Sequence, residues 1–185
     1  MGSVSLYRYY AHIRLPSALT EEVNRFEHEF QGTSRSVPHI TVIKPIHLLH
    51  GCKESDLIRG LQTVAETIPA FLVATQGVGF FDGKKNVHYC VEFGGAFRTF
   101  IRKLEAVLLQ AGYPLGSEGY ARVVHPHITL ANRISPAQGG LLLQRAKLQY
   151  TRQAFLCPEF FFLRIGPKEK AWQTIARFPL PLCSL

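Results

Sequence analysis

Long apolar runs are missing from this sequence of 185 residues. No stretch approaches the roughly 20 apolar residues that a membrane-spanning helix needs. Residues 1–15 lack the apolar core and the small-residue cleavage site of a secretory signal. With 46% hydrophobic and 18% charged residues, the composition is that of a globular protein. We therefore expect one domain over residues 1–185 that is soluble, cytoplasmic and not associated with a membrane.

Cysteine is scarce, and its spacing argues against two kinds of site. The four cysteines include no C-x-x-C pair, so neither a zinc knuckle nor a redox motif is indicated. Reduced, packed thiols are the simplest interpretation, and we expect neither a metal nor a cofactor. The four are Cys52, Cys90, Cys157 and Cys183.

Acidic residues are outnumbered, with 13 Asp and Glu against 21 Lys and Arg and a formal net charge of +8. Excess positive charge favours a polyanionic partner, because it raises the local concentration of phosphate groups. RNA or a small nucleotide is therefore the expected ligand class, although charge alone names no ligand. The sequence indicates no protein partner, and we expect a monomer.

Apolar periodicity and turn residues predict helices and strands interspersed along the chain. Helices are expected after Thr20 as N-cap, over residues 57–68 and 96–111, and from N-cap Ser135 to about residue 147. Strands are expected over residues 6–14, 36–44, 70–80, 87–93, 123–131, 155–165 and 173–178, with a hairpin turn at residues 82–86. Hairpins mixed with helices predict an α+β protein with antiparallel sheets.

One short motif occurs twice. Pro-His-Ile-Thr followed by an aliphatic residue spans residues 38–42 and again residues 126–130. From average residue usage, a second copy by chance has a probability on the order of one in a thousand. Residues two apart in a strand share a face. His39 and Thr41 therefore point one way while the aliphatic residues face the core, and the second copy repeats this arrangement.

Two imidazoles beside two hydroxyls suit the hydrolysis of a phosphodiester. A base must deprotonate the attacking water, and an acid must protonate the leaving oxygen on the opposite side of the phosphorus. Near neutral pH one imidazole can be neutral while the other is protonated. Threonine hydroxyls can donate hydrogen bonds to the non-bridging oxygens, where transition-state charge is concentrated. This chemistry requires no metal.

The paired His-x-Thr-aliphatic tetrads resemble those of the two-histidine phosphoesterase superfamily, whose bacterial branch is called the 2′-5′ RNA ligase or RNA 2′,3′-cyclic phosphodiesterase family. Residues 9–16, which end in Leu-Pro, resemble the family's opening strand. Further resemblance lies in a central hairpin over residues 77–81 and 86–93 and in the closing residues 162–163 and 178–180. The resemblance implies an α+β fold of two pseudo-symmetric lobes, each an antiparallel sheet backed by helices, with a central active-site cleft.

The resemblance also implies roles for the four motif side chains. His39 and His127 would be catalytic, and Thr41 and Thr129 would bind the phosphate. We expect hydrolysis of a 2′,3′-cyclic phosphate, at an RNA end or on a nucleotide, to a phosphomonoester, which the family suggests is the 2′-phosphate. His127 is assigned as general base and His39 as general acid.

Other functions remain open on the sequence alone. The same residues could cleave, or in reverse join, a 2′-5′ phosphodiester linkage. A nucleotide-binding module without turnover would keep the tetrads, and a general RNA-binding protein with incidental histidines would bind in a strongly salt-dependent way.

Several residues outside the tetrads are weaker candidates. Lys44 is a possible phosphate ligand, whereas a one-residue displacement of Arg133 from the family position reverses its face. His125 could join the motif histidines around zinc, but it has no acidic neighbour in the sequence. Tyr9, Phe81, Tyr89 and Tyr120 are candidate stacking platforms for bases, of which one or two should reach the site. The remaining histidines, including His12 and His88, are interpreted as ordinary.

Overall fold

The computed structural model describes residues 7–30, 37–81, 86–92, 94–113 and 125–182. Its strands are β1 (Arg8–Arg14), β2 (His39–His47), β3 (Phe71–Phe80), β4 (Asn86–Val91), β5 (His127–Asn132), β6 (Ala154–Cys157), β7 (Glu159–Ile165) and β8 (Gln173–Pro179). Its helices are α1 (Ser17–Phe30), α2 (Glu54–Thr67), α3 (Gly95–Gln110) and α4 (Pro136–Gln149). Most of the expected hairpin turn at residues 82–86 lies outside the described residues.

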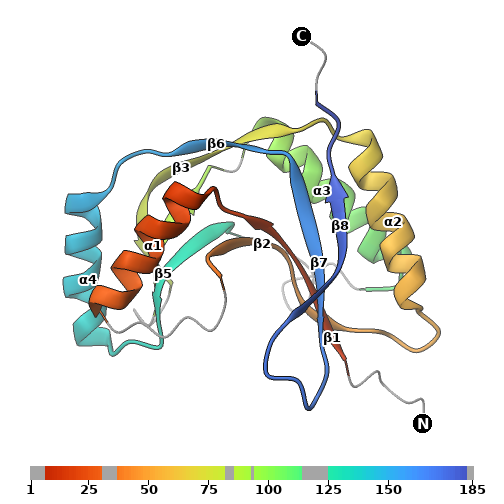
Figure 1. The fold of residues 1–185 in the computed structure, drawn as a ribbon, viewed down its shortest axis with the longest axis horizontal. Coiled ribbons are helices and arrows are strands. Elements are labelled where there is room, and N and C mark those ends of the chain that lie inside the picture. The colour runs from red at the N-terminus through yellow and green to blue at the C-terminus, as the bar shows by residue number, and fades with distance from the viewer. Residues whose placement is uncertain (1–6, 31–36, 82–85, 93, 114–124, 183–185) are drawn as a thin grey trace.

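The eight strands form one curled sheet in the order β6-β3-β4-β5-β2-β1-β7-β8, in which every pairing is antiparallel (Figure 1). Its two halves, β6-β3-β4-β5 and β2-β1-β7-β8, meet where Ile40 of β2 pairs with Ile128 of β5. The α+β fold of two antiparallel halves is therefore confirmed, with the halves joined edge to edge.

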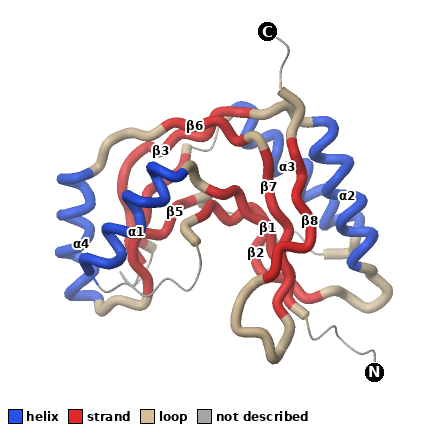
Figure 2. Tube along the Cα trace, viewed as in Figure 1, coloured by secondary structure: helices blue, strands red, loops and turns tan. Residues whose placement is uncertain are grey.

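Two helices accompany each half of the sheet, as Figure 2 shows. Helix α1 packs on β5 and α4 on β3 and β4, whereas α2 packs on β8 and beside α3. Helix α1 follows β1 of one half but covers the other half, and α3 follows β4 and lies beside α2. This reciprocal crossing relates the two halves by a pseudo-twofold axis, and the pairing of Ile40 with Ile128 joins them near the first residues of β2 and β5.

The two faces of the sheet differ in character because side chains alternate along each strand. In β1, Tyr9, Ala11 and Ile13 belong to the main core under the helices. Tyr10 belongs instead to a small cluster with Phe161, Leu163 and Trp172 on the opposite face. We call this second face, which carries Tyr10 and His39, the site face.

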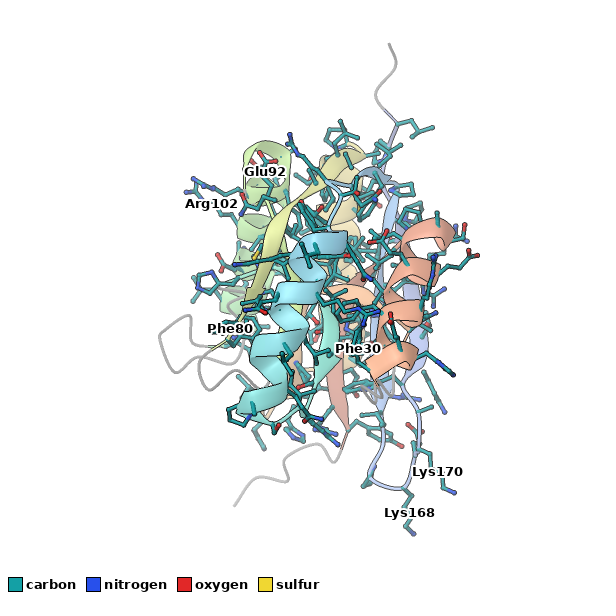
Figure 3. All side chains as sticks on the ribbon, turned by 90° about the vertical axis from the view of Figure 1, so that its left-hand side faces the viewer. Phe30, Phe80, Glu92, Arg102, Lys168 and Lys170 are labelled. Atoms are coloured by element: carbon teal, nitrogen blue, oxygen red, sulfur yellow. The ribbon has the colours of Figure 1, made fainter. Side chains whose placement is uncertain are left out.

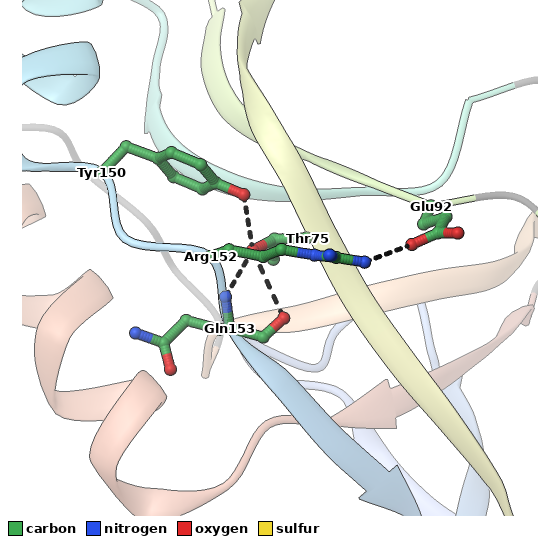
Figure 4. Close-up of polar contacts among 5 residues, drawn as sticks. All are labelled: Thr75, Glu92, Tyr150, Arg152 and Gln153. Atoms are coloured by element: carbon green, nitrogen blue, oxygen red, sulfur yellow. Dashed lines mark hydrogen bonds and ion pairs between the residues drawn. The ribbon is translucent and has the colours of Figure 1, made fainter.

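A polar cluster ties the middle of β3, at Thr75, to the segment before β6 (Figure 4). The buried Thr75 hydroxyl lies 3.0 Å from the Tyr150 hydroxyl and accepts a hydrogen bond from the Gln153 backbone N–H. On the same segment before β6, Arg152 forms an ion pair at 3.1 Å with Glu92, which follows β4. The buried threonine is thus satisfied, as a polar group in a core must be.

Cap chemistry was predicted correctly at two helix ends and wrongly at one. Ser135 caps α4 in a reciprocal capping box with Gln138, and Gly112 follows α3 with φ of 86°. Helix α1, however, begins at Ser17. Thr20 lies in its first turn, where the backbone N–H donates to the Pro16 carbonyl instead of the side chain capping the helix.

The strand predicted over residues 155–165 is two strands. Pro158 separates β6 from β7 because it has no N–H to continue a ladder. The two strands then diverge: β6 pairs with β3 in one half, and β7 pairs with β1 in the other. This single proline therefore carries the chain from one half of the sheet to the other.

Candidate active site

His39 and His127 are the first residues of β2 and β5. The ring Nδ1 of His39 lies 2.8 Å from the Val37 carbonyl oxygen, and that of His127 lies 2.9 Å from the His125 carbonyl oxygen. A carbonyl oxygen only accepts, so each Nδ1 carries a hydrogen and each Nε2 keeps its lone pair when the ring is neutral. Both catalytic candidates therefore present the same nitrogen, Nε2, for proton transfer.

The prolines of the repeated motif explain this orientation. Pro38 and Pro126 are buried and stand between each histidine and its carbonyl partner. Proline fixes φ near about −65°, so the preceding carbonyl is held in one place relative to the ring. The motif thus specifies the hydrogen bond from the histidine ring to a backbone carbonyl as well as the histidine itself.

The two motif histidines lie close enough to interact electrostatically. Burial lowers the pKa of both rings, and a positive charge on His127 lowers the pKa of His39 further. The adjacent pairing of Ile40 with Ile128 places the two strand starts side by side. Thr41 and Thr129, two residues on and likewise half-buried, share the face of their histidines. The structure thus brings all four motif side chains onto one surface.

Each motif strand carries a bulge just after its threonine. Val42 and Ile43 are both buried in β2, as are Leu130 and Ala131 in β5, at shifts of the pairing register. The extra residue reverses the alternation that follows. In β2 it turns Lys44 to the site face, where its charge lowers the pKa of His127.

In β5 the bulge gives the matching position to Asn132, which pairs with Asn86. Arg133 lies beyond the strand with φ of 59°, a left-handed conformation that is uncommon for residues other than glycine. The expectation that Arg133 does not share the face of the motif agrees with this geometry. Asn132 therefore occupies the position from which Arg133 is displaced by one residue.

A second pair of histidines, which the sequence interpretation set aside, lies beside the first. His12 of β1 pairs in register with Thr41, and His88 of β4 pairs with Thr129. The ring centroid of His12 is 4.9 Å from that of His39, and the centroid of His88 is 5.0 Å from that of His127. The interpretation of His12 and His88 as ordinary was therefore wrong about their position, because they occupy equivalent places in the two halves.

We call His12 and His88 the inner histidines, and each is oriented by the residue two positions earlier in the chain. The Tyr10 hydroxyl lies 2.9 Å from His12 Nδ1, and Asn86 Oδ1 lies 2.8 Å from His88 Nδ1. The alternating strings Tyr10-x-His12 and Asn86-x-His88 were visible in the sequence. Their significance depends on cross-strand register, which the sequence does not display.

Both inner histidines are held in the neutral form. Burial lowers the pKa of His12 to about 3, with help from the charges of His39 and Arg14. Burial, with the charges of His127 and His125, lowers the pKa of His88 to about 4. At neutral pH these rings therefore add no charge beside the motif histidines.

This neutrality predicts that acid weakens the fold through His12 and His88. Below the unfolded pKa of about 6.5 the unfolded chain binds protons that the folded chain excludes. The free energy of unfolding should therefore fall by up to about 1.4 kcal/mol for each pH unit and each of these histidines between about pH 6.5 and 4.5. Urea unfolding at a series of pH values measures the slope.

The double variant His12→Phe/His88→Phe isolates this contribution, because phenylalanine binds no proton. Its stability should vary less steeply with pH than that of the wild type, whatever its absolute value. The exposed His28→Gln on α1 serves as the control and should retain the wild-type slope. An unchanged slope in the double variant would show that other groups carry the acid sensitivity.

Among the aromatic candidates, Phe81 reaches the site. Its ring stacks on His88 with centroids 4.4 Å apart and meets His127 edge-on at 4.7 Å. Tyr9 and Tyr89 lie in the main core, and Tyr120 falls outside the described residues. The Tyr89 hydroxyl donates to Glu22 at 2.6 Å, beside a pocket of about 410 Å³ between α1, β4 and α4. That pocket lies on the core side of β4, away from the histidines.

The described residues also bear on metal binding and on membrane insertion. No group of three or more His, Cys, Asp or Glu side chains there is placed to hold a metal ion. No helix within the described ranges is long and apolar enough to cross a membrane.

Comparison with known proteins identifies a family and a fold. The sequence profile of the 2′-5′ RNA ligase superfamily matches residues 15–169, whereas no curated protein matches the chain. Escherichia coli LigT complexed with 3′-AMP superposes with a TM-score of 0.62 at 15% identity, over 94% of this chain and 96% of that one. TT0787 of Thermus thermophilus gives 0.68 at 18% identity, over 96% and 100%.

A third solved structure, the MHV ns2 PDE domain, superposes with a TM-score of 0.51 at 9% identity, over 90% of this chain and 96% of that one. At these identities the likenesses establish a shared fold. The match to the superfamily profile bears on function more directly than the shared fold does, because the matched residues include both tetrads.

Proposed function

The chain belongs to the 2′-5′ RNA ligase superfamily, which confirms the resemblance carried by the tetrads, and from this we propose that it hydrolyses nucleoside 2′,3′-cyclic phosphates. The substrate is the cyclic phosphate of an RNA end or of a nucleotide, and the product is the 2′-phosphate. The observation that carries the proposal is the matched pair of His39 and His127, each with Nδ1 bound to a carbonyl and Nε2 left for proton transfer.

The reaction follows from two proton transfers at these nitrogens. Neutral His127 takes a proton from water through Nε2 as the water oxygen bonds to phosphorus. The bond between phosphorus and O3′ breaks, and protonated His39 delivers its Nε2 proton to O3′. A 2′-phosphate and a free 3′-hydroxyl result, and proton exchange with solvent restores both rings.

Electrostatics supports these two protonation states once substrate is bound. Burial keeps His127 neutral at neutral pH, as a base must be. The negative phosphodiester between the rings favours the charged form of His39 and raises its pKa on binding. Thr41, Thr129 and Lys44 supply donors and positive charge for the non-bridging oxygens. Phe81 offers an aromatic surface beside His127.

Hydrolysis of the four nucleoside 2′,3′-cyclic monophosphates in excess EDTA tests the proposal. We expect turnover that EDTA does not inhibit and a 2′-phosphate product resolved from the 3′-isomer by chromatography. A 3′-phosphate product would show that O2′, and not O3′, is the leaving oxygen. Absence of turnover would contradict the proposal, and cleavage of 2′-5′-linked oligonucleotides by the same preparation would then identify the alternative reaction.

A further inference from the structure

The two halves of the sheet are equivalent at the histidines and differ beyond them. Arg14 pairs with His39 at the place where Cys90 pairs with His127. Phe161 pairs with His12, but the equivalent partner of His88 is Gly79, which has no side chain. Among the described residues, the half that contains β1 therefore extends the site face with aromatic and basic side chains at these two positions, where the other half has Gly79 and Cys90.

The aromatic part of this extension is continuous with the active site. The Tyr10 ring lies 5.7 Å from the His39 ring and 4.4 Å from Trp172. Trp172 stands just before β8 and is partly exposed, whereas Tyr10 beneath it is buried. A Trp ring supported from below with an exposed surface suits stacking of an unpaired base.

Positive charge accompanies these rings. The Arg8 guanidinium lies 5.7 Å from the centroid of the Trp172 ring. The Arg14 guanidinium covers Phe161 at 3.9 Å and donates to the Thr174 hydroxyl. Both arginines are exposed, and neither forms an ion pair within the part of the chain that the structure describes. Their charges are therefore available to an anion.

The loop between β7 and β8 adds two lysines to the same half. It projects beyond the ends of the two strands (Figure 1), and Figure 3 shows Lys168 and Lys170 at its tip. Both lysines are exposed. We call the set Arg8, Tyr10, Arg14, Lys168, Lys170 and Trp172 the aromatic-basic strip.

We propose that the aromatic-basic strip binds the nucleotide that precedes the reacting one in an RNA chain, so that the preferred substrate is an oligonucleotide end. The base of this nucleotide stacks on Trp172, and Arg8 and Arg14 bind its phosphate groups. Alternating aromatic and basic groups are the usual means of binding single-stranded RNA without sequence preference. This inference rests on the proposed function, since it extends the same site.

The strip also gives the pseudo-symmetric site a direction. Both ester oxygens of a cyclic phosphate belong to the ribose, so the RNA chain lies on the side of the leaving oxygen. The attacking water approaches from the opposite side. A strip beside His39 therefore makes His39 the general acid and His127 the general base.

Trp172 is the chain's single tryptophan, so its fluorescence reports on the strip alone. The His127→Ala variant, which removes the proposed base in the other half, is titrated with adenosine 2′,3′-cyclic monophosphate and with an adenosine trinucleotide ending in the same group. The trinucleotide should quench Trp172 and bind about 5- to 150-fold more tightly, the range for one stacked base. The mononucleotide should compete with it without comparable quenching.

Charge variants made in the same background test the basic part of the strip. Arg8→Gln should weaken trinucleotide binding several-fold and reduce the slope of log affinity against log salt by about 0.7. Arg102→Gln on α3, an exposed arginine outside the strip, should change neither value.

Equal affinity for the two ligands, or trinucleotide binding without quenching, would contradict binding of the preceding nucleotide by the strip. Neither result would contradict the proposed hydrolysis. If the trinucleotide quenches Trp172 but the wild-type protein hydrolyses neither ligand, nucleotide binding by the strip is supported and the proposed function is contradicted.

Discussion

Replacing His39 or His127 by alanine should reduce kcat/KM for a nucleoside 2′,3′-cyclic phosphate by about 10²- to 10⁴-fold, the usual contribution of one positioned acid or base. Each variant loses the Nε2 nitrogen that its carbonyl bond orients. Steady-state hydrolysis with product analysis measures the loss. Both side chains are half-buried and outside the main core, so circular dichroism and the urea midpoint should stay close to wild type.

A substrate with a good leaving group separates the two roles. A nitrophenyl ester of a nucleoside phosphate needs little protonation of the departing oxygen. His39→Ala should therefore recover most of its activity on this substrate, whereas His127→Ala should remain impaired. The opposite pattern would exchange the acid and the base, and wild-type rates in both variants would refute the two-histidine mechanism.

The double variant adds a further constraint. Residues that act as one unit in catalysis are non-additive, so His39→Ala/His127→Ala should be little slower than the slower single variant. Losses that multiply would indicate that each histidine acts independently, as two separate binding contacts would.

The motif residues could be predicted from the sequence because their signal is local. A tetrad in a strand fixes the face of His39 and Thr41 through the two-residue period, and the repeat of the motif identified its partner. Ser135 was equally local, since a cap depends on the next three residues. Features of this kind need no knowledge of which strands are neighbours.

The positions of the inner histidines and of the aromatic-basic strip could not be predicted, because they depend on contacts between residues that are far apart in the sequence. His12 matters because β1 pairs with β2 in a particular register, and Trp172 because the loop before β8 returns to Tyr10. The bulges act in the same way, since one extra residue decides that Lys44 shares the face of His39. Simple alternation therefore predicts the face of each side chain correctly up to Thr41 and assigns the wrong face to Lys44.

Replacing Thr41 or Thr129 by valine should lower kcat by about 10²- to 10³-fold, the range measured when one donor to a developing oxyanion is removed. Valine keeps the β-branched shape and the strand preference of threonine, so the backbone of β2 and β5 should be unaffected. Because charge on the non-bridging oxygens is greatest in the transition state, kcat should fall more than KM rises.

Thr41→Ser and Thr129→Ser are the matched controls, because serine restores the hydroxyl and removes only a methyl group. Both should retain most of the wild-type kcat. If the valine variants raise KM and leave kcat unchanged, the hydroxyls bind substrate and transition state equally and contribute nothing specific to the chemical step. If serine fails as completely as valine, the threonine methyl groups act by packing beside His12 and His88, their cross-strand partners.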